Sequence, residues 1–259
     1  MIALKPSKKL GQCFLQDESA AEQIAEAIDL ENKSVLEIGA GTGQLTVFLA
    51  ARAKKVTAIE VDSKLVPELR DSLSSFTNAA IVRADALDVD FNGYDALFGN
   101  LPYNISTPLL LKILESDAPA AVLLLQKEFA ERMAAPAGSK EYSRLSVLAQ
   151  NNARIELIAE VPASCFSPQP RVNSAIVLLV KKPVRERKKL DEQLVSALFQ
   201  HKNQTVRNAV THSAHFLGLS KLKAKKLAEK LSLKDLRVRD LGVEQLARLG
   251  AEFKALAHR

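Results

Sequence analysis

The stretch GNLPYNIS, residues 99–106, places an amide, a proline and an aromatic ring side by side directly after the short apolar run DALF. The side-chain oxygen of Asn100 and the backbone carbonyl of Leu101 could accept hydrogen bonds from the two hydrogens of an adenine amine. Pro102 would fix the turn, and Tyr103 would offer a ring face to an unstacked base. These residues therefore favour attack of the amine nitrogen on a methyl group. The alternative is a Pro-Tyr turn with a capping Asn100.

A second candidate site is the glycine-rich segment VLEIGAGTGQLT, residues 35–46. It predicts a strand that runs into Gly39, Gly41 and Gly43 and then into a helix beginning near Gln44. Glycines at the carboxyl end of a first strand let the backbone approach a ligand closely. The spacing is GxGxG and not the GxGxxG of dinucleotide binders, which favours a different nucleoside cofactor.

Two carboxylates follow the next two predicted strands. Glu60 ends the strand in AIEVD and could accept hydrogen bonds from both ribose hydroxyls, whereas Asp85 in RADALD could accept one from an exocyclic adenine amine. Alternatively, Glu60 is a helix N-cap and Asp85 a turn residue. The ordered set of a glycine loop and two acids indicates S-adenosylmethionine (SAM) as the cofactor.

These residues need a sheet that brings strand ends together. Between residues 34 and 180, short β-branched runs alternate with amphipathic stretches, which predicts an α/β, Rossmann-like fold: a mostly parallel sheet with helices on both faces. The predicted strands are SVLEI, KVTAIEV, AAIVRA, DALFGN, AAVLLLQ, IELIAEV and SAIVLLVKK. Because GNLPYNIS follows the fourth strand, it should open onto the same crevice as the glycine loop.

From Leu190 onward the pattern becomes helical, as in LDEQLVSALFQ, KLKAKKLAEKL and VEQLARLGAEFKAL. We therefore predict a catalytic domain over residues 1–182 and a small all-helical domain over residues 183–259. Residues 1–180 carry 17 Lys and Arg against 22 Asp and Glu, and residues 181–259 carry 19 against 8. A basic helical domain is expected to bind a phosphate backbone. The alternative is a lysine-rich solvated surface.

Composition excludes several other classes of protein. A chain of 259 residues with 47% hydrophobic content can bury a sizeable core, and its longest apolar runs are too short to span a membrane. The N-terminus lacks the apolar centre of a signal peptide, so we expect a soluble, cytoplasmic protein. Cys13 and Cys165 are far apart without CxxC or paired His, which argues against a disulfide framework or a metal site.

Together these motifs resemble the small-subunit ribosomal RNA adenine dimethyltransferases, nearly end to end. The resemblance also includes KKLGQCFLQD, LLLQKEFAERM, YSRLSVLAQ, VPASCFSPQPRVNSAIV and FQHKNQTVRNAV, all in the family's order. It implies SAM-dependent dimethylation of N6 on two adjacent adenosines near the 3′ end of small-subunit rRNA. We accordingly expect a monomer that acts on rRNA within a pre-ribosomal particle.

The resemblance also assigns candidate residues. Phe166 is expected to stack on the flipped adenine opposite Tyr103, or else to anchor the SPQP loop on the core. Asn100, Leu101, Pro102, Tyr103 and Phe166 form the catalytic set. The candidate cofactor-binding residues are Gln12, Cys13, Leu15, Gly39, Gly41, Glu60, Asp85, Ala86 and Asn100. The candidate RNA-binding residues are Lys202, Arg207, Lys221, Lys223, Lys225 and Lys226.

Two positions depart from the family pattern. The family usually has Asn where this chain has Cys13, whose thiol makes only weak hydrogen bonds. A run of three basic residues common in the family is here Lys202, Asn203 and Gln204, and KLKAKK could compensate for the lost charge.

The expected mechanism is in-line methyl transfer without a covalent intermediate, in which positioning and hydrogen bonds polarise the amine. The base must leave its stack, which a single-stranded loop makes easy. One alternative is a large-subunit rRNA adenine methyltransferase of the antibiotic-resistance type. QKEFAERM and SRLSVLAQ favour the small-subunit family. Another alternative is a mainly non-catalytic ribosome assembly factor.

Overall fold

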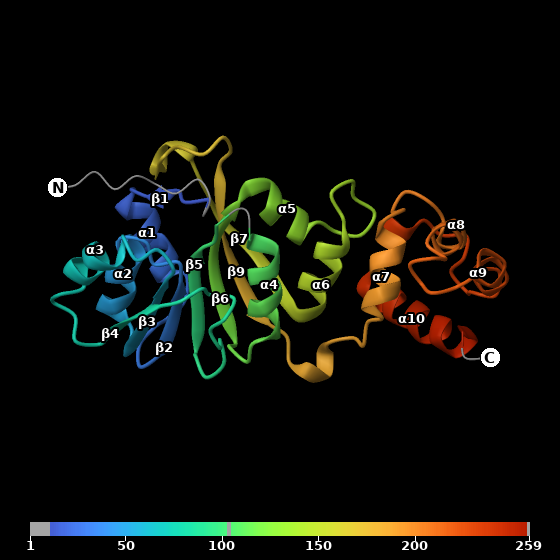
Figure 1. Ribbon diagram of the computed structural model, residues 1–259, viewed down its shortest axis with the longest axis horizontal. Helices are drawn as coiled ribbons and strands as arrows, with labels where there is room; N and C mark the ends of the chain where they lie inside the picture. The colour runs from blue at the N-terminus through green and yellow to red at the C-terminus, as the bar shows by residue number, and fades with distance from the viewer. Residues whose placement is uncertain (1–10, 103–104, 258–259) are drawn as a thin grey trace. The chain divides into compact units, whose positions relative to one another are not determined.

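The computed structural model describes residues 11–102 and 105–257, which divide into two compact units (Figure 1). The first unit comprises the chain up to Ala130 together with Ala153–Lys181, and the second comprises Glu131–Asn152 and the chain from Lys182 onward. The boundary therefore falls within helix α5 (Lys127–Ala134).

A seven-stranded sheet forms the first unit, in the order β4-β3-β2-β5-β6-β9-β7. Neighbouring strands from β4 to β6 pair in parallel, and β9 pairs antiparallel with both β6 and β7. The strands are β2 (Ser34–Ile38), β3 (Lys55–Glu60), β4 (Ala79–Arg83), β5 (Ala96–Asn100), β6 (Ala120–Gln126), β7 (Ala153–Val161) and β9 (Ser174–Lys181). All seven predicted strands are confirmed, and the sheet is mostly parallel as expected.

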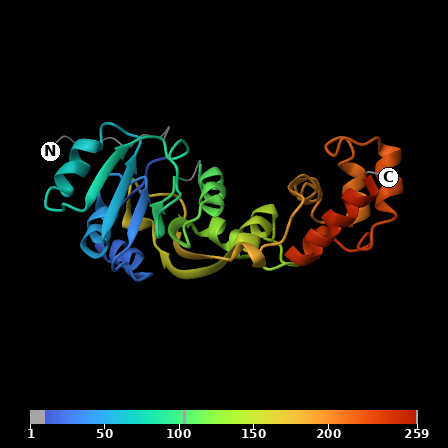
Figure 2. The same ribbon diagram turned by 90° about the horizontal axis from the view of Figure 1, so that it is seen from below.

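Helices cover both faces of this sheet. Val56 and Ala58, alternate residues of β3, point to one face, where they pack in apolar clusters with α1 (Glu18–Glu26), α2 (Gln44–Arg52) and α3 (Val66–Ser72). Helix α4 (Ser106–Glu115) lies on the opposite face, as a right-handed connection from β5 to β6 requires (Figures 1 and 2). The Rossmann-like arrangement is therefore confirmed.

A separate two-stranded ribbon joins the N-terminal segment to the loop that precedes β9. Strand β1 (Phe14–Leu15) pairs antiparallel with β8 (Phe166–Ser167), which follows the short 3-10 helix Ala163–Cys165. The backbone N–H of Gln16 extends this pairing by donating to the carbonyl of Cys165 at 2.8 Å.

The second unit is helical around its own apolar core. Its helices are α6 (Arg144–Asn152), α7 (Glu192–Phe199), α8 (Val206–His212), α9 (Lys221–Ala228) and α10 (Val243–Ala257), with 3-10 turns at Val184–Glu186 and Val238–Asp240. Side chains of Asp191, Thr205 and Ser220 accept hydrogen bonds from the first turns of α7, α8 and α9, respectively. These N-caps satisfy backbone donors that have no partner within the helix, so each helix begins at a defined residue.

The compact units differ from the division expected from the sequence in one respect. Residues 131–152 group with the C-terminal helices, although this segment of helix, loop and helix between two strands gives no compositional break. Val147 of this segment packs in the same core as Leu194 and Leu198 of α7. Counted over the two compact units, the net charges are −5 and +11. The charge segregation therefore does not depend on where the boundary is drawn.

Candidate active site

A cavity of about 210 Å³ lies where the strands β2, β3, β4 and β5 end, and it belongs entirely to the first unit. All nine candidate cofactor-binding residues line it, as do Leu101 and Pro102. These residues come from five separate places along the chain. The sheet brings four of these places together because the carboxyl ends of parallel strands share one edge, and the N-terminal segment joins them through the hydrogen bond from Asn100 to the Cys13 carbonyl.

The glycine loop reaches this cavity through backbone conformations that other residues adopt only with strain. Gly39, Gly41 and Gly43 have φ values of 75°, 61° and 95°. Helix α2 begins directly afterwards at Gln44, so its N-terminal end faces the cavity. This arrangement leaves room for a ligand against the backbone.

Glu60 holds the glycine loop in place. Its Oε2 accepts a hydrogen bond from the Gly41 N–H and its Oε1 accepts one from the Asp62 N–H, each at 2.8 Å. The side chain is 5% exposed, and burial raises its carboxyl pKa, although the backbone donors oppose this shift. Each oxygen keeps a second lone pair, so accepting from these amides does not preclude accepting from a ligand hydroxyl.

Asp85 combines the two interpretations made from the sequence. Its Oδ1 accepts from the Leu87 N–H at 2.9 Å and so forms the tight turn after β4. The residue also lines the cavity together with Ala84 and Ala86. Its role as a turn acid is compatible with a contact to a ligand through its remaining acceptor capacity.

Asn100 is oriented by the N-terminal segment. Its Nδ2 donates to the backbone carbonyl of Cys13 at 2.9 Å, which fixes the amide plane and leaves Oδ1 as the acceptor. The Cys13 backbone makes this contact, so it does not depend on the side chain that replaces the family's Asn. Gln12 Nε2 donates to Asp62 Oδ2 at 3.2 Å, which also ties this segment to the loop after β3.

Two further features support the turn that follows Asn100. A Cβ added to Gly99 would lie 2.7 Å from the carbonyl oxygen of Ile38, so only glycine lets β5 approach β2 this closely. The Pro102 carbonyl accepts from the Ile105 N–H at 3.1 Å and from the Ser106 Oγ at 2.9 Å. Tyr103 lies outside the described residues, so its expected stacking role remains a prediction.

Phe166 is held in the core of the first unit by strand pairing. Its side chain is 4% exposed and packs in the core cluster of the first unit, where β8 places it opposite Leu15. Among the described residues that line the cavity, Phe166 is absent. This packing is compatible with the alternative interpretation, in which the ring anchors the SPQP loop, and the stacking of Phe166 on an adenine stays a prediction.

Glu37 is a cavity residue that the sequence interpretation missed. It lies in β2, is 2% exposed, and burial raises its pKa to about 8. Its Oε2 has no hydrogen-bond partner among the described residues. An acid inside the apolar run SVLEI, directly before the glycine loop, was the available signal. A buried carboxyl with one oxygen that lacks a hydrogen bond is suited to a cationic ligand at this cavity wall.

The candidate RNA-binding residues of the second unit fall into two groups. Lys202 donates to the carbonyls of Lys140 and Tyr142 at 2.8 and 3.0 Å, and Arg207 pairs with Glu229 and Asp235, both at 3.4 Å. These two cations therefore have structural partners. The remaining four are exposed on α9: Lys221, Lys223, Lys225 and Lys226.

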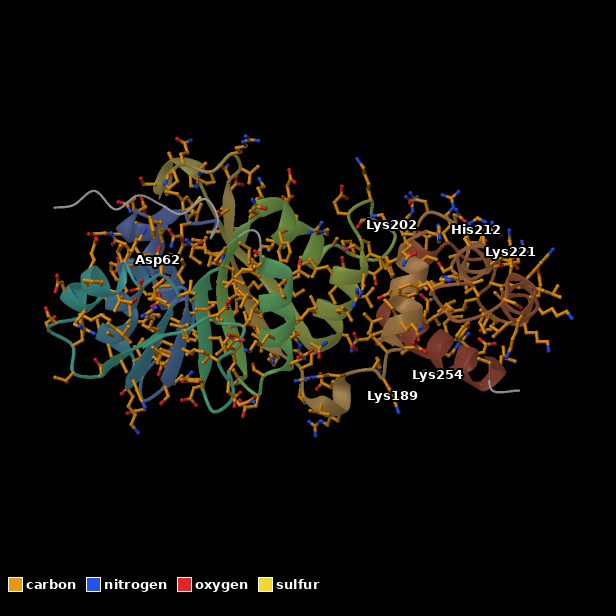
Figure 3. All side chains as sticks on the ribbon, in the orientation of Figure 1. Asp62, Lys189, Lys202, His212, Lys221 and Lys254 are labelled. Carbon is orange, nitrogen blue, oxygen red and sulfur yellow. The ribbon has the colours of Figure 1, made fainter. Side chains whose placement is uncertain are left out.

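Figure 3 labels Lys202 and Lys221 on this unit, where nitrogen-tipped side chains extend outward. Lys223 Nζ lies 3.4 Å from the carbonyl of Ala257. Within the described chain, no ion pair to a carboxylate is formed by Lys221, Lys225 or Lys226. These three cations are therefore the better candidates for phosphate contacts.

Other expectations concern metals and membranes. Cys13 and Cys165 are both free thiols, and residues 11–102 and 105–257 contain no cluster of His, Cys, Asp or Glu suited to hold a metal ion. Over the same ranges, none of the helices combines the length and apolarity that crossing a membrane requires.

Comparison with known proteins identifies the family. The family model for ribosomal RNA adenine dimethylases matches residues 3–244. A probable ribosomal RNA small subunit methyltransferase A from Methanococcus maripaludis is 45% identical over 237 residues, which cover 89% of this chain and 90% of that protein.

Solved structures agree with this match. A dimethyladenosine transferase from Plasmodium falciparum has a TM-score of 0.78 at 29% identity, covering 94% of this chain and 98% of that one. The 23S rRNA methyltransferase ErmE has a TM-score of 0.66 at 27% identity, covering 93% and 99%. With a family model that matches nearly its whole length, the chain belongs to the ribosomal RNA adenine dimethylase family.

Proposed function

We propose that the protein transfers methyl groups from SAM to N6 of two adjacent adenosines near the 3′ end of small-subunit rRNA during ribosome biogenesis. The observation that carries this proposal is the anchored amide of Asn100 at the rim of the glycine-loop cavity. A fixed acceptor next to a nucleoside-sized cavity is what methylation of an amine requires. Family membership supports the choice of adenine in rRNA.

The cavity fits SAM by the chemistry of its walls. Gly39 and Gly41 provide a close backbone approach, Glu60 and Asp85 provide acceptors for ribose hydroxyls and the adenine amine, and Glu37 provides a buried carboxyl for a positive charge. When bound, the cofactor supplies an electrophilic methyl group on a sulfonium centre. The side chains of this site do not need to supply a nucleophile of their own.

The residues at the end of β5 would act on the amine of the substrate. The Asn100 Oδ1 and the Leu101 carbonyl accept its two hydrogens, so that the nitrogen lone pair leaves conjugation with the ring and points at the methyl carbon. The nitrogen would form a bond to the methyl carbon while the bond from that carbon to the sulfonium sulfur breaks, so that S-adenosylhomocysteine leaves, and the methylated amine would then release one proton to water. Hydrogen bonds from Ile105 and Ser106 to the Pro102 carbonyl keep these acceptors aimed during the step.

The second unit would bind the RNA. Its net charge of +11 contrasts with −5 on the catalytic unit, and the exposed lysines of α9 extend from one short helix. Such a surface releases counterions when it binds phosphates, which gives affinity without sequence preference. We infer that this unit docks a small-subunit precursor and that the protein works as a monomer.

A large-subunit rRNA substrate is the nearest competing function, because ErmE shares the fold. The small-subunit reading is favoured by the higher identity to the Methanococcus protein and by the higher TM-score of the Plasmodium transferase. A non-catalytic assembly factor is disfavoured by the intact Asn100, Leu101 and Pro102 at the cavity.

Purified protein would be incubated with labelled SAM and either undermethylated small subunits or large subunits, and the products located by mass spectrometry. We expect dimethyladenosine at two adjacent positions of the small-subunit rRNA, and little product with Asn100→Ala. Label only in large subunits would replace this proposal with the ErmE-type function. Binding to small subunits without any methylation would point to an assembly factor.

A further inference from the structure

Lys112 lies between two turns at the cavity: the turn after Asn100, here called the catalytic turn, and the turn of residues 84–88, which carries Asp85. It lies in α4, and its Nζ donates to the carbonyl of Ala86 at 3.0 Å and to the carbonyl of Leu87. The same ammonium sits over the ring of Phe91, 4.7 Å from the ring centre, and that ring is 1% exposed. Three separate contacts therefore hold one lysine on the outer side of the cavity wall.

These contacts act on a turn whose inner side faces the cavity. Asp85 and Ala86 line the cavity, and the turn is closed by the Leu87 N–H to Asp85 Oδ1 bond at 2.9 Å and by the Asp88 N–H to Asp85 carbonyl bond at 3.0 Å. No regular helix or strand contains residues 84–88. The conformation of this turn thus depends on few bonds, of which Lys112 supplies two.

The other end of α4 contacts the catalytic turn. Ile105 and Ser106 donate to the Pro102 carbonyl, and Ile105 and Leu109 line the cavity itself. Leu109 and Lys112 are three residues apart, so they lie on neighbouring positions of the same helix. One rigid helix therefore touches both the residues that hold the amine and the turn that holds the nucleoside.

We propose that Lys112 is a positioning residue for the nucleoside end of the cofactor: it fixes the Asp85 turn relative to Asn100 through α4. The inference rests on the proposed function, in which Asp85 accepts a hydrogen bond from the exocyclic amine of the cofactor's adenine. Lys112 lies outside the cavity lining and touches no reacting atom. Its effect is on recognition of the adenine.

The chemistry of the contacts explains why a lysine suits this position. A charged ammonium can donate three hydrogen bonds, here to two neighbouring carbonyls that converge on one point. Methionine would preserve most of the aliphatic packing beside Phe91 but would donate no hydrogen bond. Arginine would keep both charge and donors. Comparing Lys112→Met with Lys112→Arg therefore separates the effect of the hydrogen-bond donors from the effect of side-chain packing.

The test measures binding of S-adenosylhomocysteine and its inosine analogue by calorimetry. The analogue carries a carbonyl where adenine has the amine, so the wild type should bind it more weakly. We expect Lys112→Met to weaken binding of the adenosine ligand about tenfold, the size of one lost charged hydrogen bond, and to reduce its preference over the analogue. Lys112→Arg should keep the wild-type affinity and the wild-type preference for the adenosine ligand. Lys54→Met, at an exposed lysine of the same unit, serves as the control and should leave the affinity and the preference unchanged.

Kinetics and a double variant supply further readouts. Lys112→Met should raise KM for SAM while kcat at saturating SAM stays near wild type, which a general loss of folded protein would not produce. In an Asp85→Asn background, where the amine acceptor is already altered, Lys112→Met should have a smaller effect. Equal effects in the two backgrounds would overturn the proposal.

Other outcomes are equally decisive. Unchanged affinity and unchanged preference in Lys112→Met would overturn the positioning role. If that variant does not fold, Lys112→Gln replaces it, because its shorter amide cannot reach both carbonyls, and wild-type preference in that variant would again overturn the role. Failure of the wild type to bind S-adenosylhomocysteine would overturn the proposed function and this inference together.

Discussion

The buried carboxyl of Glu37 makes the stability of the ligand-free protein depend on pH. Burial raises its pKa from 4.5 to about 8, with a further contribution from the Glu60 carboxylate and an opposing one from the Thr46 hydroxyl. The folded protein therefore keeps a proton that the unfolded chain loses above pH 4.5. Since the folded state binds this proton more tightly, the stabilisation is complete below the unfolded pKa and is lost as pH rises toward 8.

The magnitude follows from the size of the shift. Each pKa unit corresponds to about 1.4 kcal/mol, so between pH 5 and pH 8 this one group should lower the free energy of unfolding by about 3 kcal/mol. In Glu37→Gln the side chain keeps its shape and cannot ionise, so this contribution should vanish. Urea denaturation at pH 5 and pH 8 measures both proteins, and Glu115→Gln, at an exposed position of α4, serves as the control.

The expected result is that wild type and Glu115→Gln lose the same stability between the two pH values, whereas Glu37→Gln loses about 3 kcal/mol less. Parallel pH slopes in all three proteins would refute the assignment of a buried neutral carboxyl. A bound cation should favour the carboxylate, so S-adenosylmethionine binding at pH 7 should release a proton from wild type but not from Glu37→Gln. Calorimetry in buffers of different ionisation enthalpy detects that proton.

Three further predictions concern the catalytic turn and the second unit. Asn100→Ala should abolish most turnover while folding and RNA affinity stay near wild type, because the amide acts on the amine as its geometry changes; single-turnover assays and filter binding check this. Gly99→Ala should destabilise the protein by about 1–3 kcal/mol, since its Cβ would lie 2.7 Å from the Ile38 oxygen, and denaturant melts measure the loss. Reversing the charges of Lys221, Lys225 and Lys226 should flatten the salt dependence of small-subunit binding by about one log unit per lost phosphate contact, with methylation of a free adenosine analogue unchanged. An unaltered salt slope would argue against docking by α9.

Local patterns in the sequence were enough to predict most of the fold. Every strand of the large sheet was visible as a short apolar run, and the start of α2 at Gln44 followed from the glycines before it. The candidate cofactor residues line one cavity, and the places of Glu60, Asp85 and Asn100 in it were predictable because each ends or follows a strand and strand ends share one edge. Their contacts with a cofactor stay a prediction. Glu37 was missed because its neighbours gave it the appearance of an ordinary strand position.

Contacts made by backbone carbonyls had no signal in the sequence. The carbonyl of Cys13 orients Asn100, and the carbonyls of Ala86 and Leu87 receive Lys112, yet any residue type offers a carbonyl. Cys13 lies 87 residues from Asn100, and Ala86 and Leu87 lie 26 and 25 residues from Lys112. No local spacing in the sequence therefore predicts these contacts. The burial of Phe166 had no signal in the sequence either, since it follows from the pairing of β8 with the distant N-terminal segment. Side-chain type predicts which chemistry a site can perform, but the folded backbone decides which of those groups are free to perform it.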